Sequence, residues 1–237
     1  MLFRSILGLA ATAATCLGAS LQQVGNFGKN PTEIQMHIYV LDGLATKPAI
    51  IVAPLTPNQN NCWDVQNSAS LTHGAGGDAL GIVSMVNYTI DKHGADRARA
   101  GAAYSGVPHA CFLGAPSATP ISPNQTCAQG LQKTPQEWGN LVRNSFPGYT
   151  GRRPRMQITH GLADTLVRPQ CAVEALKQWS NVLGVEFNRN VTGVPSAGWT
   201  QQIYGDGTKL LGFFGQGVGH APSVNEQQLL KFFGLTK

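Results

Sequence analysis

Short strand-like runs alternate with amphipathic helices along this chain, and this order constrains the fold more than any other feature. The apolar, β-branched run PAIIVA (48–53) is typical of a strand buried on both faces of a parallel sheet. Further strands are indicated by MHIYVL (36–41), MQITH (156–160), TQQIYG (200–205) and KLLGFFG (209–215). Apolar spacing with Pro or Gly boundaries predicts helices over 78–93, 134–146, 169–184 and 224–233. The alternation predicts an α/β fold with a mostly parallel sheet flanked by helices.

The first 20 residues, MLFRSILGLAATAATCLGAS, have the pattern of a secretory signal. Arg4 precedes an apolar run over residues 6–17, and three small residues follow it. Because this run is too short to span a bilayer permanently, we expect a signal peptide over residues 1–19 and one secreted, extracellular domain over residues 20–237. A buried N-terminal helix is the alternative. No other apolar run approaches membrane length, so no membrane partner is predicted.

Charge is spread thinly along the chain. Seventeen Lys and Arg side chains stand against 12 Asp and Glu, and they form no basic stripe. The charge therefore gives no support to a nucleic-acid partner and suits a secreted protein. Three sequons, at Asn87, Asn124 and Asn190, permit glycosylation in a secretory compartment.

Four cysteines follow the signal: Cys62, Cys111, Cys127 and Cys171. An even number in an oxidising compartment predicts two disulfides, for which three connectivities are open. We favour Cys111 with Cys127, because the segment between them is rich in Pro, Ser and Asn and can bend back on itself. Zinc binding is the competing interpretation, but no CxxC or HxxxH spacing supports it. We expect neither a metal nor a cofactor.

Two loops that follow predicted strands carry residues suited to acid–base chemistry. Asp164 comes after MQITH, and His220 comes after LLGFFG and before the last helix. Reactive groups of open α/β sheets lie on loops at the carboxyl ends of strands, and an acid followed by a histidine is the α/β-hydrolase order. Asp164 would orient the imidazole of His220, which would move the proton of a serine. The alternative is a turn or capping role for Asp164 and an ordinary loop histidine at 220.

Several longer segments resemble a known family. They are NCWDV, ASLTHGAGGDALGIVSMVNYTI, GAAYSGVPHACF, TPQEWGNLVRNSFPGYTGRRPRMQITHGLADTLVRPQ and GFFGQGVGHAPSV. Together they resemble the fungal acetylxylan and feruloyl esterases of carbohydrate esterase family one, which are related to polyhydroxybutyrate depolymerases. The resemblance covers nearly all of the chain from Ser20 onward. It implies an α/β-hydrolase-type fold, secretion, removal of acetyl or feruloyl groups from plant cell-wall xylan, and a serine triad containing Asp164 and His220.

The nucleophile that this resemblance implies is missing. No GxSxG, the strand-to-helix turn that lifts a serine toward its histidine, occurs in the sequence. By resemblance, a segment with this turn is absent between Arg99 and Gly101. A second segment, with an oxyanion-hole contact and the usual partner of Cys62, is absent after Ala53, which leaves a bridge from Cys62 to Cys171 open. Ser105 is the nearest substitute and a poor one, because no helix is predicted after it, so a turn role suits it better.

Loss of a triad serine lowers turnover by a factor on the order of 10⁶. Because the chain has no such serine in a GxSxG turn, three interpretations are open. The chain is an esterase of this family, a non-catalytic secreted protein that binds xylan, or a mis-spliced product. The last interpretation assumes that two segments of roughly 25 to 40 residues, each about one βα unit, have been lost. Trp63, beside Cys62, is a candidate for lining the substrate cleft, and packing of its ring in the core is the alternative.

Overall fold

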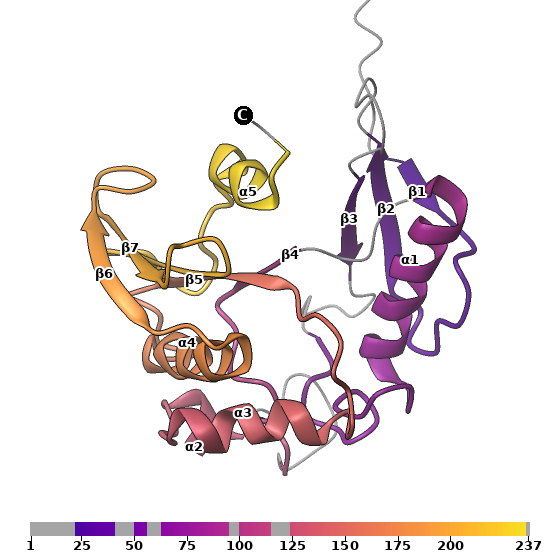
Figure 1. Ribbon diagram of the computed structural model, residues 1–237, viewed down its shortest axis with the longest axis horizontal. Coiled ribbons are helices and arrows are strands. Elements are labelled where there is room, and N and C mark those ends of the chain that lie inside the picture. The colour runs from indigo at the N-terminus through magenta and orange to yellow at the C-terminus, as the bar shows by residue number, and fades with distance from the viewer. Residues whose placement is uncertain (1–21, 41–49, 56–62, 95–99, 115–123, 236–237) are drawn as a thin grey trace, which may run out of the picture.

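The computed structural model describes residues 22–40, 50–55, 63–94, 100–114 and 124–235, which form two β-sheets and the helices around them (Figure 1). The strands are β1 (Gln22–Val24), β2 (Gln35–Val40), β3 (Ile50–Leu55), β4 (Ala100–Tyr104), β5 (Arg155–Gly161), β6 (Phe187–Thr192), β7 (Trp199–Tyr204) and β8 (Leu210–Gly215). The helices are α1 (Gly77–His93), α2 (Gln125–Ala128), α3 (Pro135–Asn144), α4 (Gln170–Leu183) and α5 (Glu226–Phe233). The predicted signal peptide and Cys62 lie outside the described residues.

The larger sheet has five strands in the order β4-β5-β8-β7-β6. β4, β5 and β8 are parallel, whereas β7 and β6 run antiparallel. The α/β class is therefore confirmed, but the sheet is mixed rather than mostly parallel. The reason is the connections: residues 193–198 join β6 to β7 and residues 205–209 join β7 to β8, and such short links permit only antiparallel neighbours.

Helices cover both faces of this sheet. Figure 1 shows α4 and α3 on one face and α5 on the other. The core between α4 and the sheet consists of Ile158, Ala172, Ala175, Leu176, Tyr204, Leu210 and Phe214. The core beneath α5 consists of Ile203, Leu211, Phe213 and Phe232. Two apolar layers therefore hold β5 and β8, the strands that lead into the candidate site, between helices.

Local signals set the ends of the helices. α3 begins with a capping box, in which the side chain of Thr134 accepts from the Glu137 N–H and the side chain of Glu137 accepts from the Thr134 N–H. α1 and α4 end at Gly94 and Gly184, whose φ angles of 61° and 63° are left-handed. The predicted helix ends are confirmed here, because caps depend on residues only a few positions apart.

The smaller sheet has the order β1-β2-β3 and is antiparallel throughout. The expectation that PAIIVA forms a strand inside a parallel sheet is wrong, because β3 pairs antiparallel with β2 and has no second neighbour among the described strands. β4 is likewise an edge of its own sheet. The two junctions at which segments are expected to be absent, after Ala53 and between Arg99 and Gly101, lie inside β3 and at the start of β4.

The predicted disulfide between Cys111 and Cys127 is present, with Cα atoms 5.6 Å apart. Cys171 is a free, buried thiol that donates to the carbonyl oxygen of Cys127 at 3.1 Å. A second disulfide through Cys171 is therefore not formed. The thiol packs against the disulfide-linked loop instead.

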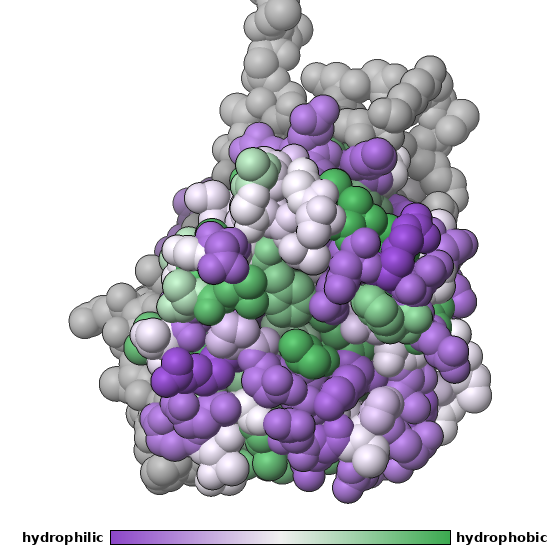
Figure 2. Space-filling model, turned by 90° about the vertical axis from the view of Figure 1, so that its left-hand side faces the viewer, coloured by the Kyte–Doolittle hydropathy of each residue, from purple (hydrophilic) through white to green (hydrophobic). Residues whose placement is uncertain are grey.

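β6 forms the edge of the larger sheet opposite β4, and this edge faces solvent. Five of the six residues of β6 are exposed, which explains why no apolar pattern predicted this strand. Figure 2 views the molecule from this side, where hydrophilic side chains cover most of the lower half and hydrophobic ones gather across the middle. Polar residues on an edge strand disfavour pairing with other chains.

Candidate active site

Two crossing loops bring Asp164 and His220 together. β5 and β8 are parallel neighbours, so their carboxyl ends lie at the same edge of the sheet. The loop after β5 is tied to the loop after β8 by a hydrogen bond from Ala163 N–H to Val218 O at 2.9 Å. As a result, the side chains of Asp164 and His220 meet although they are 56 residues apart in the chain.

Asp164 is buried, with 1% of its surface exposed, and its carboxylate is well supplied with donors. Its Oδ2 lies 2.8 Å from Nδ1 of His220. Its Oδ1 accepts from the N–H groups of Leu166 at 2.9 Å and Val167 at 3.0 Å. Burial alone would raise the pKa of this carboxyl, but the hydrogen bonds from His220, Val167 and Leu166 outweigh burial and lower the pKa. The carboxylate is therefore ionised at neutral pH.

His220 is the more exposed member of the pair. The side chain is 43% exposed, and no group within the described part of the chain hydrogen-bonds to Nε2. Because Asp164 holds the proton on Nδ1, the neutral imidazole has its lone pair on Nε2. This is the nitrogen that accepts a proton from a hydroxyl group in general base catalysis.

A second histidine, His160, lies against the same carboxylate, and the sequence had not indicated it as a site residue. It is fully buried near the end of β5, and its Nε2 lies 3.1 Å from Asp164 Oδ2 and 2.9 Å from Val167 O. Burial lowers the pKa of His160, and the contacts with Val167 and Asp164 offset burial only in part. The ring is thus neutral, and its contact with Asp164 is a hydrogen bond rather than an ion pair. The sequence signal that could have indicated His160 is its position four residues before Asp164, at the end of a predicted strand.

Ser105, the weak candidate for a nucleophile, lies at the end of β4 with φ 48° and 8% of its surface exposed. Its N–H donates to Thr159 O at 2.9 Å, whereas its Oγ has no hydrogen-bond partner among the described residues. Residues 106–114 form turns and no helix. Ser105 is therefore not bonded to His220 and does not begin a strand-to-helix turn.

Trp63 lies between β3 and α1 in the sequence and packs against the core of the smaller sheet. It is partly buried against the cluster of Phe27, Ile34, Met36, Ile38 and Met85. This contact supports the core-packing interpretation of Trp63 rather than a place in a substrate cleft.

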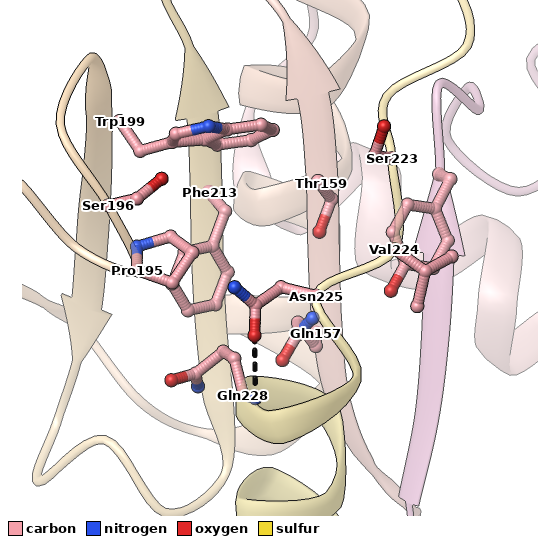
Figure 3. A pocket seen from close by; sticks show the side chains of 11 residues that line it. Gln157, Thr159, Pro195, Ser196, Trp199, Phe213, Ser223, Val224, Asn225 and Gln228 are labelled. Atoms are coloured by element: carbon pink, nitrogen blue, oxygen red, sulfur yellow. Dashed lines mark hydrogen bonds between the residues drawn. The ribbon is translucent and has the colours of Figure 1, made fainter.

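A cavity of about 170 Å³ lies on the α5 side of the larger sheet (Figure 3). Trp199 and Phe213 supply aromatic walls, and no lining residue is charged. The hydroxyl groups of Tyr104 and Thr159 and the side-chain oxygen of Gln157 have no hydrogen-bond partner among the described residues. Asp164 and His220 do not line this cavity, so we assign the cavity no part in proton transfer.

Other predicted features remain untested. Among the described residues, no group of three or more His, Cys, Asp or Glu side chains could hold a metal ion. Within the same ranges, no helix is long and apolar enough to cross a membrane. Asn87 and Asn190 are exposed on α1 and β6, and Asn124 caps α2, so glycosylation at these sequons stays a prediction.

Comparison with known proteins gives close relatives over the whole chain, although no family model matches it. Feruloyl esterase B of Thermothelomyces thermophilus is 59% identical over 290 residues, with 99% of this chain and 100% of the relative covered. Feruloyl esterase B of Neurospora crassa is 60% identical over 290 residues, with 99% of each chain covered. A probable acetylxylan esterase A of Aspergillus fumigatus is 35% identical over 92% of this chain and 74% of its own length.

A solved structure agrees with these relatives. The acetyl xylan esterase from Aspergillus awamori superposes with a TM-score of 0.81 and 32% identity, covering 92% of this chain and 100% of its own. The alignments with the two feruloyl esterases span 290 positions against 237 residues here, so each relative holds at least 53 residues without a counterpart in this chain. Identity at this level over the full length shows that the chain belongs to the family of fungal feruloyl and acetylxylan esterases, which are carboxylic ester hydrolases.

Proposed function

We propose that this protein is a carboxylic ester hydrolase for esterified xylan of plant cell walls, with Asp164 and His220 as its acid–base pair. The observation that carries the proposal is the 2.8 Å contact between a buried carboxylate and an exposed imidazole. Asp164 orients His220 and stabilises its charged form. Nε2 of His220 takes the proton of the attacking hydroxyl and returns it to the leaving alcohol.

Among the two acyl groups, the relatives favour feruloyl over acetyl. The two relatives with 59% and 60% identity are named feruloyl esterase B, whereas those named probable acetylxylan esterase A share 33% to 35%. We therefore propose feruloylated xylan as the preferred substrate.

The serine nucleophile belongs, in this proposal, to the part of the family fold that this chain lacks. No GxSxG occurs in the sequence, and the relatives carry at least 53 residues without a counterpart here. Ser105 Oγ has no hydrogen bond to His220. Because loss of the serine lowers turnover by on the order of 10⁶, the second candidate function is binding of xylan without hydrolysis.

The test compares this chain with a restored chain, in which the segments of the 59% identical feruloyl esterase are inserted after Ala53 and between Arg99 and Gly101. Release of ferulate from methyl ferulate and of ferulate or acetate from esterified xylan is measured for both. We expect hydrolysis by the restored chain and its loss in the restored His220→Ala variant. Full activity of that variant would refute the proposed role of His220.

Three further results separate the alternatives. Hydrolysis by the present chain that disappears in Ser105→Ala would make Ser105 the nucleophile. Sedimentation of the present chain with insoluble xylan, without release of acid, would support the binding function. Sequencing of the transcript across codons 53–62 and 99–101 tests the mis-splicing interpretation, which requires the missing segments to be present in other transcripts.

We also infer that the protein is secreted and that residues 1–19 are removed. The leader pattern supports secretion, as does a disulfide between Cys111 and Cys127, since such bonds persist in oxidising compartments. A secreted protein whose first residue is Ser20 would agree with this inference, and retention of Met1 would contradict it.

A further inference from the structure

His160 is a buried titratable residue that the proposed proton transfer does not use. We infer that His160 is a positioning residue: its neutral imidazole donates one Nε2–H to both Asp164 Oδ2 and Val167 O, and thereby holds the carboxylate toward His220. This inference rests on the proposed function, because it assigns a purpose to the orientation of Asp164. His160 has no exposed surface, so its role is an indirect one.

The two contacts of Nε2 decide where the proton lies. Val167 O, at 2.9 Å, and Asp164 Oδ2, at 3.1 Å, are both acceptors, so Nε2 must carry a hydrogen for either contact to be favourable. The opposite tautomer would place the Nε2 lone pair against two oxygens. It would also leave a buried Nδ1–H without an acceptor, because Nδ1 has no partner among the described residues.

The same geometry excludes the imidazolium form. A protonated ring would expose a second donor, Nδ1–H, to an environment that offers it no acceptor within the described residues, and His160 is fully buried. An unpaired buried donor and a buried charge are both costly. The carboxylate of Asp164 attracts a proton, but burial of the ring is the larger effect and lowers the pKa of His160. His160 is therefore a fixed donor at neutral pH.

With this proton placed, each oxygen of Asp164 accepts two hydrogen bonds. Oδ1 accepts from the N–H groups of Leu166 and Val167, and Oδ2 accepts from His160 and His220. The bond from His160 to Val167 O also ties the end of the loop to the end of β5. Rotation of the carboxylate would break several of these bonds at once, so His160 holds Oδ2 at the position that His220 needs.

Other titratable groups near the pair do not replace His160. His220 faces Asp164 from the loop after β8, and Cys171 on α4 lies close enough for the charge of Asp164 to disfavour its thiolate. Burial raises the pKa of Cys171 to about 11, so this thiol stays neutral. Glu174, further along α4, pairs with Lys177 and Trp138. Only His160 and His220 thus donate to Oδ2 of Asp164 within the described residues.

The test uses NMR on the full chain and needs no turnover. Ring ¹⁵N shifts of His160 report its tautomer and charge, and the ¹³Cγ shift of Asp164 reports its pKa. We expect His160 to be the neutral Nε2–H tautomer at pH 7 to 8. His160→Leu fills the buried position with an apolar side chain but removes the Nε2–H donor, so the pKa of Asp164 should rise by about one unit. His160→Gln, which retains an N–H donor, should restore at least half of this shift.

His109→Leu is the matched control, because His109 is a partly buried histidine with no hydrogen bond to Asp164 among the described residues, and it should leave the pKa of Asp164 unchanged. A charged His160 at pH 7, a proton on Nδ1, or an unchanged Asp164 pKa in folded His160→Leu would each overturn the inference. If His160→Leu does not fold, the tautomer in the unaltered chain still decides. Failure of the restored chain to hydrolyse esters would refute the proposed function without altering these NMR results, so the two failures are distinguishable.

Discussion

Gly161, the last residue of β5, lies against the backbone of Val218 in the loop that carries His220. A Cβ atom at position 161 would lie far inside van der Waals distance of the carbonyl oxygens of Val218 and Gly219. The backbone of both loops is fixed here by the hydrogen bond from Ala163 N–H to Val218 O. Only a residue without a side chain allows this crossing, and the crossing sets the separation of the carboxylate and the imidazole.

The first prediction concerns this crossing. Gly161→Ala should lower the free energy of unfolding by about 1–3 kcal/mol, because the added methyl group meets backbone that cannot move aside. Gly219→Ala is the control: a Cβ there meets nothing within 4 Å, so its effect should stay within about 0.5 kcal/mol. Urea unfolding of both variants measures the difference. Equal stability of the two variants would show that the loops do not depend on Gly161.

The second prediction concerns Glu174, a carboxylate buried between α3 and α4 that accepts from Trp138 Nε1–H at 2.8 Å. Burial would raise the pKa of Glu174, but the hydrogen bonds from Lys177 and Trp138 outweigh it and lower the pKa. Because the pKa of Glu174 is lower in the folded state than in the unfolded state, its ionised carboxylate stabilises the fold at pH values above 4.5, the ordinary pKa. This stabilisation is lost as the pH falls through the folded-state pKa.

We therefore expect Glu174→Gln to lose about 1–3 kcal/mol at pH 7 and the difference from the unaltered chain to shrink below pH 4.5. Unfolding in urea at pH 3.5, 5 and 7 tests this sign. Exposed Glu186→Gln is the control for removal of a carboxylate charge, and its effect at pH 7 should stay within about 0.5 kcal/mol. A deficit of the same size at all three pH values would contradict an ionised Glu174.

The third prediction concerns the thiol of Cys171. Burial is the main cause that raises its pKa to about 11, and the thiolate is the reactive form. Iodoacetamide at pH 8 should leave Cys171 unmodified in the folded protein and label it in denaturant. Peptide mapping by mass spectrometry locates the label. Labelling of Cys171 within minutes under native conditions would disprove its burial.

The fourth prediction concerns the disulfide between Cys111 and Cys127, which closes a loop over a sequence separation of 16. Joint replacement of both cysteines by alanine should lower the free energy of unfolding by about 3 kcal/mol, because the unfolded chain regains the entropy that the bond removes. Denaturant unfolding of this variant beside Cys171→Ala separates the bond from the neighbouring thiol. A loss below about 1 kcal/mol would mean that the fold holds this loop without the bond.

Local features were readable from the residues alone. The ends of α3 and α4 followed from Thr134 with Glu137 and from Gly184, since caps involve neighbours in the chain. β5 and β8 followed from their apolar runs, and these strands placed Asp164 and His220 at one edge of the sheet. Strand direction was less accessible: β3 was expected in a parallel sheet, and β6 was missed because it is exposed.

By itself, the sequence determined the alternation of most strands and helices, the cysteine loop, the acid-then-histidine order and the absence of a GxSxG serine, because each depends on residue type and spacing along the chain. The tertiary structure alone decided that Gly161 lets two backbones cross and that buried His160 turns its Nε2–H toward Asp164. These features depend on burial and on distances between segments far apart in the chain, which no pattern of neighbouring residues encodes.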